Sequence, residues 1–152
     1  MRDQNWIQSV FQQRWLLYAL LSAVSASFVG IFGKLGMADI DSNLATAIRS
    51  VVMTLFLVGV CSAMGVWSKV GTLHGRAMLM IVLSGVAGAV SWLFYFRAIQ
   101  IGEVSKVAPI DKLSMPFAVL LAVMIIGDRP TGRNWLGVAL IVAGGYLAAA
   151  KR

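Results

Sequence analysis

Five long apolar runs, separated by short polar turns, constrain this chain more than any other feature of its sequence. The runs cover about residues 15–37, 44–66, 77–99, 107–126 and 135–150, and the last is the shortest. A helix of about 20 apolar residues crosses the hydrocarbon core of a bilayer, where each backbone polar group must be bonded within its own segment. The pattern predicts an all-α integral membrane protein with five transmembrane helices.

The composition supports the same class and excludes others. Hydrophobic residues make up 59% of the chain and charged residues 12%, with a mean hydropathy of +0.83, whereas a soluble domain is about 25% charged. The 13 Lys and Arg against 6 acids therefore indicate anchored helix ends rather than a nucleic-acid partner. With a single cysteine, Cys61, and a single histidine, His74, the sequence lacks a metal-ligand set. It also lacks a nucleophile with a base nearby, so we expect neither a cofactor nor an enzyme.

The segment 1–14 differs from the five-helix domain, 15–152, that follows it. Trp6, Ile7, Val10 and Phe11 recur at helical spacing among polar residues. This spacing predicts a short helix that lies in the membrane interface, with a frayed tail as the alternative.

The cations are evenly divided between the two membrane faces. The N-terminal side has six, at 2, 14, 69, 76, 129 and 133, and the other side has seven, at 34, 49, 97, 106, 112, 151 and 152. Orientation follows the Lys and Arg content of short loops. The balance therefore leaves two possibilities open: insertion in both orientations, or a cytoplasmic N-terminus if the embedded cations are discounted.

Charged residues cluster at one end of the apolar runs. The candidates for substrate binding or coupling among them are Lys34, Arg49, Arg97, Lys106, Asp111 and Lys112. Charges at the edge of a hydrocarbon span are costly and usually line a cavity or pathway. The surplus of cations predicts a hydrated vestibule for a small anionic or zwitterionic solute. The alternative is that Lys34, Arg97 and Lys106 only reach out to lipid headgroups.

The 107–126 run carries the acid Asp111 and two prolines, Pro109 and Pro116. An acid beside Arg49 or Lys112 within a span could bind a proton or a cation in one state and release it in another. Alternatively, it forms an ion pair that holds the 44–66 and 107–126 helices together. Prolines remove backbone donors and break helices, and broken helices recur at transporter binding sites. Prolines also occur in membrane helices for packing alone.

Two aromatic residues, Trp92 and Tyr95, could form the wall of a substrate chamber near the end of the 77–99 run. The alternative is the aromatic belt at the membrane interface, which Tyr95 fits better than the deeper Trp92. Small residues in the 135–150 run, such as Gly144 and Gly145, predict a close-packing face that could serve as a dimer contact.

Six motifs between Gly30 and Leu147 resemble one family. They are IFGKLG (31–36), LATAIR (44–49), SWLFYFRA (91–98), SKVAPIDKLS (105–114), GDR (127–129) and GVALIVAG (137–144). Together they resemble the EamA-type branch of the drug/metabolite transporter superfamily, in its single-unit form of five helices. Two residues depart from the family pattern: Asp128 stands where Glu is common, and Pro116 where a branched or small residue is expected.

The resemblance implies secondary transport of a small metabolite, often its export, across a bacterial inner membrane. Longer relatives join two inverted units in one chain, so a single unit implies an antiparallel homodimer in the bilayer or a pairing with another protein. Inverted repeats place the substrate near the middle of the membrane. The alternative function is a non-transporting accessory subunit that assembles with a partner transporter.

Overall fold

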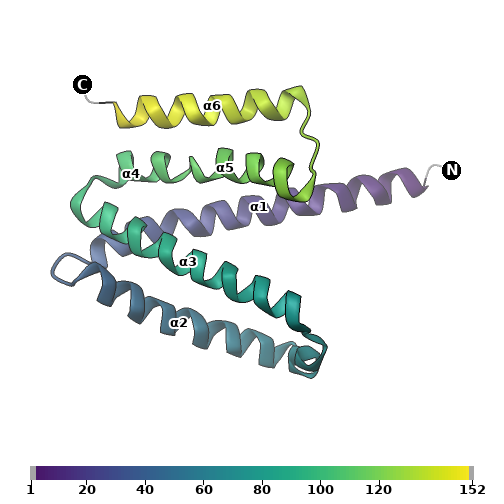
Figure 1. Ribbon diagram of the computed structural model, residues 1–152, viewed down its shortest axis with the longest axis horizontal. Coiled ribbons are helices and arrows are strands. Elements are labelled where there is room, and N and C mark those ends of the chain that lie inside the picture. The colour runs from purple at the N-terminus through teal and green to yellow at the C-terminus, as the bar shows by residue number, and fades with distance from the viewer. Residues whose placement is uncertain (1–2, 151–152) are drawn as a thin grey trace.

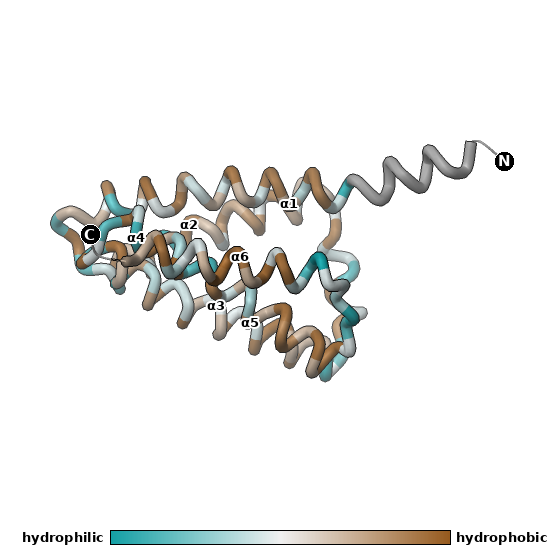
Figure 2. The backbone as a smooth tube through the Cα atoms, turned by 90° about the horizontal axis from the view of Figure 1, so that it is seen from above, coloured by the Kyte–Doolittle hydropathy of each residue, from teal (hydrophilic) through white to brown (hydrophobic). Residues whose placement is uncertain are grey.

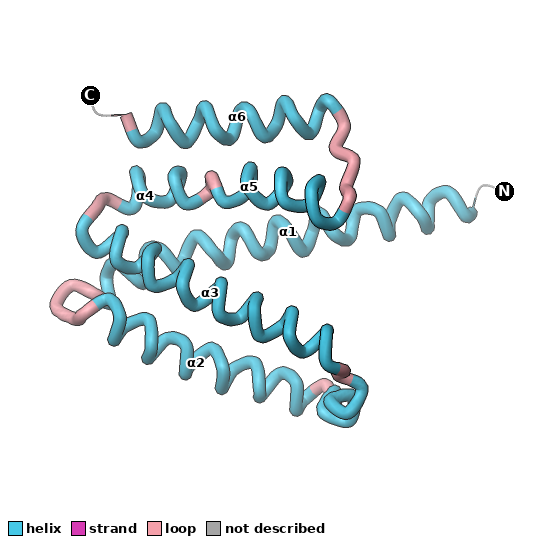
Figure 3. Tube along the Cα trace, viewed as in Figure 1, coloured by secondary structure: helices cyan, strands magenta, loops and turns pink. Residues whose placement is uncertain are grey.

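The computed structural model consists of helices that run back and forth between two ends (Figure 1). It describes the backbone of residues 3–150 and the side chains of residues 14–150. The elements are α1 (Asp3–Gly36), α2 (Ser42–Ala63), the 3-10 helix η1 (Val66–Thr72), α3 (Gly75–Ile101), α4 (Val104–Asp111), α5 (Ser114–Leu121), the π-helical η2 (Ala122–Ile126) and α6 (Gly132–Ala149). Residues 3–150 contain no strand (Figure 3), which confirms the all-α prediction.

Four segments are long and apolar enough to cross a membrane: Arg14–Gly36, Ser42–Ala63, Gly75–Ile101 and Val104–Ile126. The helix α6, expected as the fifth span, is not among them. It has 18 residues and begins with the polar Arg133 and Asn134 next to Gly132. Four candidate spans are therefore established within the described residues.

Some helix boundaries differ from those expected. The helix α1 begins at Asp3, so the segment expected to lie in the interface is continuous with the first span, although the side chains of residues 1–13 lie outside the described part. The second helix, expected to reach residue 66, ends at Ala63 because Gly65 adopts a left-handed conformation with φ of 63°. Glycine tolerates this conformation and commonly follows a helix end.

The beginning of α1 and the end of α6 lie at opposite ends of the bundle (Figure 1). The helix α2 packs against α3. The helices α4 and α5 both pack against α6, and α1 packs against both α3 and α4. Viewed from above, hydrophobic residues extend along the helices and hydrophilic ones concentrate toward the ends (Figure 2). The packing thus joins the α2–α3 pair to the group of α4, α5 and α6 through α1 and the α3–α4 turn.

The buried residues lie mostly toward one end, which we call the core end. It is formed by the α1–α2 turn, residues 37–41, and the α3–α4 turn at Gly102. The buried hydrophobic residues are Met37, Phe96 and Ile99. Most other large apolar side chains of the spans are exposed, as suits helices whose surroundings are lipid rather than water. The opposite end, with η1 and the α5–α6 loop, is the far end.

The contact between α4 and α6 depends on Gly145. A Cβ at this position would lie 3.2 Å from the Pro109 carbonyl oxygen and 3.3 Å from the Leu113 side chain, whereas one at Gly144 would have no neighbour within 4 Å. We expect Gly145→Ala to lower the free energy of unfolding by about 1 kcal/mol through overpacking. The matched variant Gly144→Ala should raise it by up to about 1 kcal/mol through helix propensity. Thermal unfolding in detergent, monitored through the reactivity of the Cys61 thiol, measures both changes in stability. Equal changes in the melting temperatures of the two variants would contradict this account.

Candidate functional site

The fourth span is broken between its two prolines. Pro109 lies inside α4, the helix is interrupted at Lys112 and Leu113, and Pro116 occupies the first turn of α5. Proline lacks an N–H and its ring excludes the carbonyl four residues earlier, here that of Lys112. That carbonyl instead accepts a hydrogen bond of 3.0 Å from the Met115 N–H. The break therefore brings Asp111 and Lys112 to an irregular turn within the span.

A polar cavity of about 200 Å³ lies where this break faces α1 and α3. Its lining residues are Ala26, Val29, Ser91, Trp92, Tyr95, Asp111, Lys112 and Ser114. The Asp111 carboxylate lies 3.4 Å from the Lys112 ammonium, and the side chains are 33% and 49% exposed. Asp111 thus pairs with its neighbour in sequence and not with a cation of α2. It remains accessible from the cavity.

An aromatic cluster on α3 separates this cavity from α2. The Trp92 ring lies 5.7 Å from that of Tyr95 and 5.5 Å from that of Phe96, between centroids. Glycines on α1 allow this close approach: the Tyr95 hydroxyl would lie 2.7 Å from a Cβ at Gly30, and the Phe96 ring lies against Gly33. The aromatic cluster is thus held by α1 as well as by α3.

Arg49 lies on the other side of the aromatic cluster. Its guanidinium carbon is 3.6 Å from the centroid of the Trp92 ring and 5.3 Å from that of Phe96. Such a position over a ring face is attractive because of the ring quadrupole. Among residues 14–150 the ion pairs are Glu103–Lys106 and Asp111–Lys112, so the structure gives Arg49 no carboxylate partner there.

A larger groove, the α1–α2 groove, has Arg49 on its wall and a volume of about 540 Å³. Its lining residues are Ser25, Phe28, Val29, Phe32, Gly33, Gly36, Met37, Ile40, Ala45, Ile48, Arg49 and Phe96. Val29 lines both this groove and the polar cavity, and the contacting Trp92 and Phe96 rings lie between the two spaces. The sequence reasoning missed the groove, although Ser25, Phe28 and Phe32 recur at helical spacing on one face of α1.

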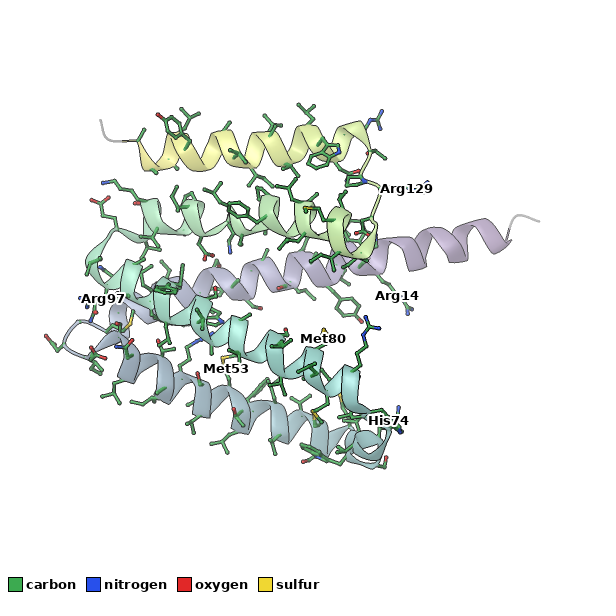
Figure 4. The ribbon with its side chains drawn as sticks, viewed as in Figure 1. Arg14, Met53, His74, Met80, Arg97 and Arg129 are labelled. Carbon is green, nitrogen blue, oxygen red and sulfur yellow. The ribbon has the colours of Figure 1, made fainter. Side chains whose placement is uncertain are left out.

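The other three candidate cations line neither space. Arg97 donates a hydrogen bond of 2.9 Å to the Gln100 side chain, and Lys106 pairs with Glu103 at 3.0 Å on an exposed surface. Figure 4 shows Arg97 at the opposite end of the bundle from Arg14, His74 and Arg129. Lys34 also lies at the core end, where its ammonium group donates hydrogen bonds to the carbonyl oxygens of Ile99 (2.6 Å), Gln100 (3.1 Å) and Gly102 (3.0 Å).

These hydrogen bonds make Lys34 a cap for the C-terminal end of α3. Unpaired carbonyls and the negative end of the helix dipole both favour a cation there. Because hydrogen bonds to a charged group contribute about 1.5–3 kcal/mol, we expect Lys34→Met to lower the free energy of unfolding by about 2 kcal/mol. Thermal unfolding in detergent measures the loss, and the exposed Lys106→Met is the control. An equal effect of the two variants would contradict the cap.

A third cavity lies at the far end, between α5 and the start of α6. It has a volume of about 430 Å³ and is lined by Ala118, Val119, Ala122, Asp128, Arg129, Pro130 and Asn134. None of the predicted site residues lies there. The structure therefore brings Trp92, Tyr95, Asp111 and Lys112 together around the polar cavity, with Arg49 behind Trp92.

Comparison with known proteins shows the family of the chain. The EamA-like transporter family matches residues 13–150. The chain belongs to this family. A protein of Sinorhizobium sp., named an uncharacterized transporter in the cobO 3′ region, is 43% identical over 137 residues, which cover 90% of this chain and 97% of that protein. The resemblance inferred from the motifs is therefore confirmed.

Two longer relatives match only part of the chain. Riboflavin transporters of Rhizobium johnstonii and Vibrio cholerae are 33% and 34% identical over 69 and 64 residues, which cover 45% and 42% of this chain and 23% and 22% of those proteins. No solved structure gives a significant match. The family and these relatives are transporters, not enzymes. The family match, the bacterial relatives and the four candidate spans together identify the chain as an integral membrane protein of the bacterial inner membrane.

Proposed function

We propose that this EamA-family transporter is a secondary active exporter of a small anionic or zwitterionic metabolite, and that it works by alternating access. The observation that carries the proposal is the meeting of Trp92, Tyr95, Asp111 and Lys112 around one cavity at a broken span. Unwound segments within spans are where transporters bind substrates and ions. Asp111, accessible from the cavity, supplies the group that would couple transport to a proton or a cation.

The working assembly in this proposal is a homodimer of two inverted units, with α6 as the fifth span of each. The balanced cations support insertion in both orientations. The side chains on most faces of the helices are exposed, which leaves surface for a second copy. A reporter placed after Arg152 and read in intact and permeabilised cells tests this assembly. Similar amounts on both sides are expected, and a single orientation would exclude the inverted homodimer.

The purified protein in liposomes tests transport itself. We expect at least one labelled carboxylate or amino acid from a panel to accumulate against its gradient when a proton or sodium gradient is applied. Protein-free liposomes are the control. The alternative function, an accessory subunit, predicts no flux in the absence of a partner protein, so flux by this chain alone excludes it.

Riboflavin is a second candidate solute, which the names of the two partial relatives suggest. The aromatic lining by Trp92 and Tyr95 could stack on its ring system. Riboflavin belongs in the same liposome panel, where its fluorescence reports uptake directly. Because riboflavin is uncharged, its transport should depend less on Arg49 than transport of an anion.

A further inference from the structure

The side chain of Arg49 is fixed in position but its hydrogen-bonding groups are free. Its guanidinium lies over the Trp92 ring, and within residues 14–150 the structure shows no hydrogen bond or ion pair from Arg49. Arg49 is the eighth residue of α2, about 10 Å along the helix from its start. An unpaired arginine within a span is costly, by about 2.5–3.5 kcal/mol at the centre of the span and less toward its end, so a ligand that pairs with Arg49 would gain affinity there.

The guanidinium geometry indicates which anion fits. The guanidinium carbon lies 3.6 Å from the centroid of the Trp92 ring, and within residues 14–150 none of the Arg49 N–H groups donates a hydrogen bond or joins an ion pair. Five N–H donors in a planar fork match the two oxygens of a carboxylate. Stacking on the ring also reduces the side-chain entropy that the arginine would otherwise lose on binding.

The surroundings of Arg49 indicate what the carboxylate is attached to. Apart from Ser25 and Arg49, the residues that line the α1–α2 groove are apolar or glycine. The volume of about 540 Å³ is within the range of small-molecule sites. None of the residues that line the groove is an acid that could pair with an ammonium group. Asp111 lines the other cavity. A zwitterion would therefore leave its ammonium group unpaired in an apolar groove.

We propose that the α1–α2 groove binds a small amphiphilic monocarboxylate, with its carboxylate on the guanidinium edge of Arg49 and its apolar body beside Phe28 and Phe32. This inference rests on the proposed function, narrows its substrate class, and assigns the substrate to the groove and only the coupling acid Asp111 to the polar cavity. It places the ligand in the groove, on the opposite side of the Trp92–Phe96 pair from Asp111. Binding and coupling thus use separate spaces that share the wall residue Val29.

The test measures equilibrium binding of two matched probes, 2-naphthoate and its uncharged analogue 2-naphthamide. The protein is placed in nanodiscs of phosphatidylcholine, and titration calorimetry is corrected with empty nanodiscs. We expect naphthoate to bind at least about tenfold more tightly than the amide, since a hydrogen-bonded charge pair contributes more than about 1.4 kcal/mol. Arg49→Gln should remove this preference. A preference that survives Arg49→Gln would overturn the proposal.

Two tryptophan variants of α1 locate the probe. Ser25 lines the groove, so Ser25→Trp should weaken binding of both probes at least about tenfold by occupying the space of their apolar body. Ser27→Trp places the same side chain two residues away, outside the groove, and should leave binding unchanged. Unchanged binding to Ser25→Trp would overturn the proposal. Melting temperatures of all variants, measured through Cys61, show that each is folded.

Two further outcomes separate this inference from its alternatives. If phosphatidylglycerol in the nanodiscs displaces naphthoate in an Arg49-dependent way, the groove is a lipid site and the proposal fails. If naphthoate binding depends on Arg49 but liposomes show no flux of any solute, the inference stands and the transport proposal fails. If liposomes show solute flux but naphthoate binds equally well to the Arg49→Gln variant, the inference fails and the transport proposal stands.

Discussion

Asp111→Asn is expected to reduce uphill transport in liposomes to the level of protein-free controls while preserving downhill exchange of the same solute. Asparagine keeps the shape of the side chain and one acceptor oxygen but can neither bind a proton nor carry a charge. Exchange needs only that the loaded transporter reorients, whereas accumulation needs a group that binds the coupling ion. The two assays on one preparation therefore isolate the coupling role.

The structure also indicates which effects Asp111→Asn would have if Asp111 had only a structural role. Its ion pair with Lys112 is at least one third exposed on both sides, and such pairs contribute about 0–1 kcal/mol. If Asp111 has only a structural role, Asp111→Asn should lower the melting temperature slightly and cause no selective loss of uphill transport. The double variant Asp111→Asn, Lys112→Gln should then regain part of the lost melting temperature. Glu103→Gln, which breaks the exposed pair with Lys106, is the control. Uphill transport by Asp111→Asn at the wild-type rate would contradict the coupling role.

Gly33→Val is expected to have the largest effect on stability, a loss of about 3 kcal/mol from overpacking at the core end. The Phe96 ring lies so close to Gly33 that even a methyl group would overlap it, and Phe96 is 2% exposed. The ring cannot simply move, because it is in contact with Trp92, which supports Arg49. The same variant should therefore weaken naphthoate binding.

Gly59→Val is the matched control for this prediction. Gly59 lies within α2, where a Cβ would have no neighbour within 4 Å, so the substitution changes helix propensity alone. Thermal unfolding in detergent, read through Cys61, compares the two variants. Similar melting temperatures would show that α1 can move away from α3 without loss, and the account of the core end would be wrong.

Much of the fold could be predicted because membrane spans are specified locally. The lengths of the apolar runs give the helices, and the alternating direction of successive spans puts Lys34, Arg97 and Asp111 toward one end. Pro116 marks the break in the fourth span because its missing N–H acts on its own helix. These features depend on residues within one segment, which a single sequence displays.

The candidate site was less predictable because its interactions join distant segments. Lys34 and the carbonyl of Ile99 are 65 residues apart, and nothing in the sequence distinguishes a lysine that caps a neighbouring helix from one that reaches the headgroups. Arg49 and Asp111 were expected near one another, yet the rings of Trp92 and Phe96 place Arg49 in a different space from Asp111. Only the packing of α1, α2, α3 and α4 decides which side chains share a cavity.

The position of the buried core at one end of the helices has a mechanical consequence. With 27 residues, α3 is about 40 Å long, so a rotation of about 10° around the core end would move its opposite end by about 7 Å. The Lys34 cap and the Phe96 contact would act as the fulcrum, and α2 and α3 together as the lever arm. Such a lever needs no bending within a span. The amplitude of its movement would be set by helix length, and its stiffness by a few contacts near the fulcrum.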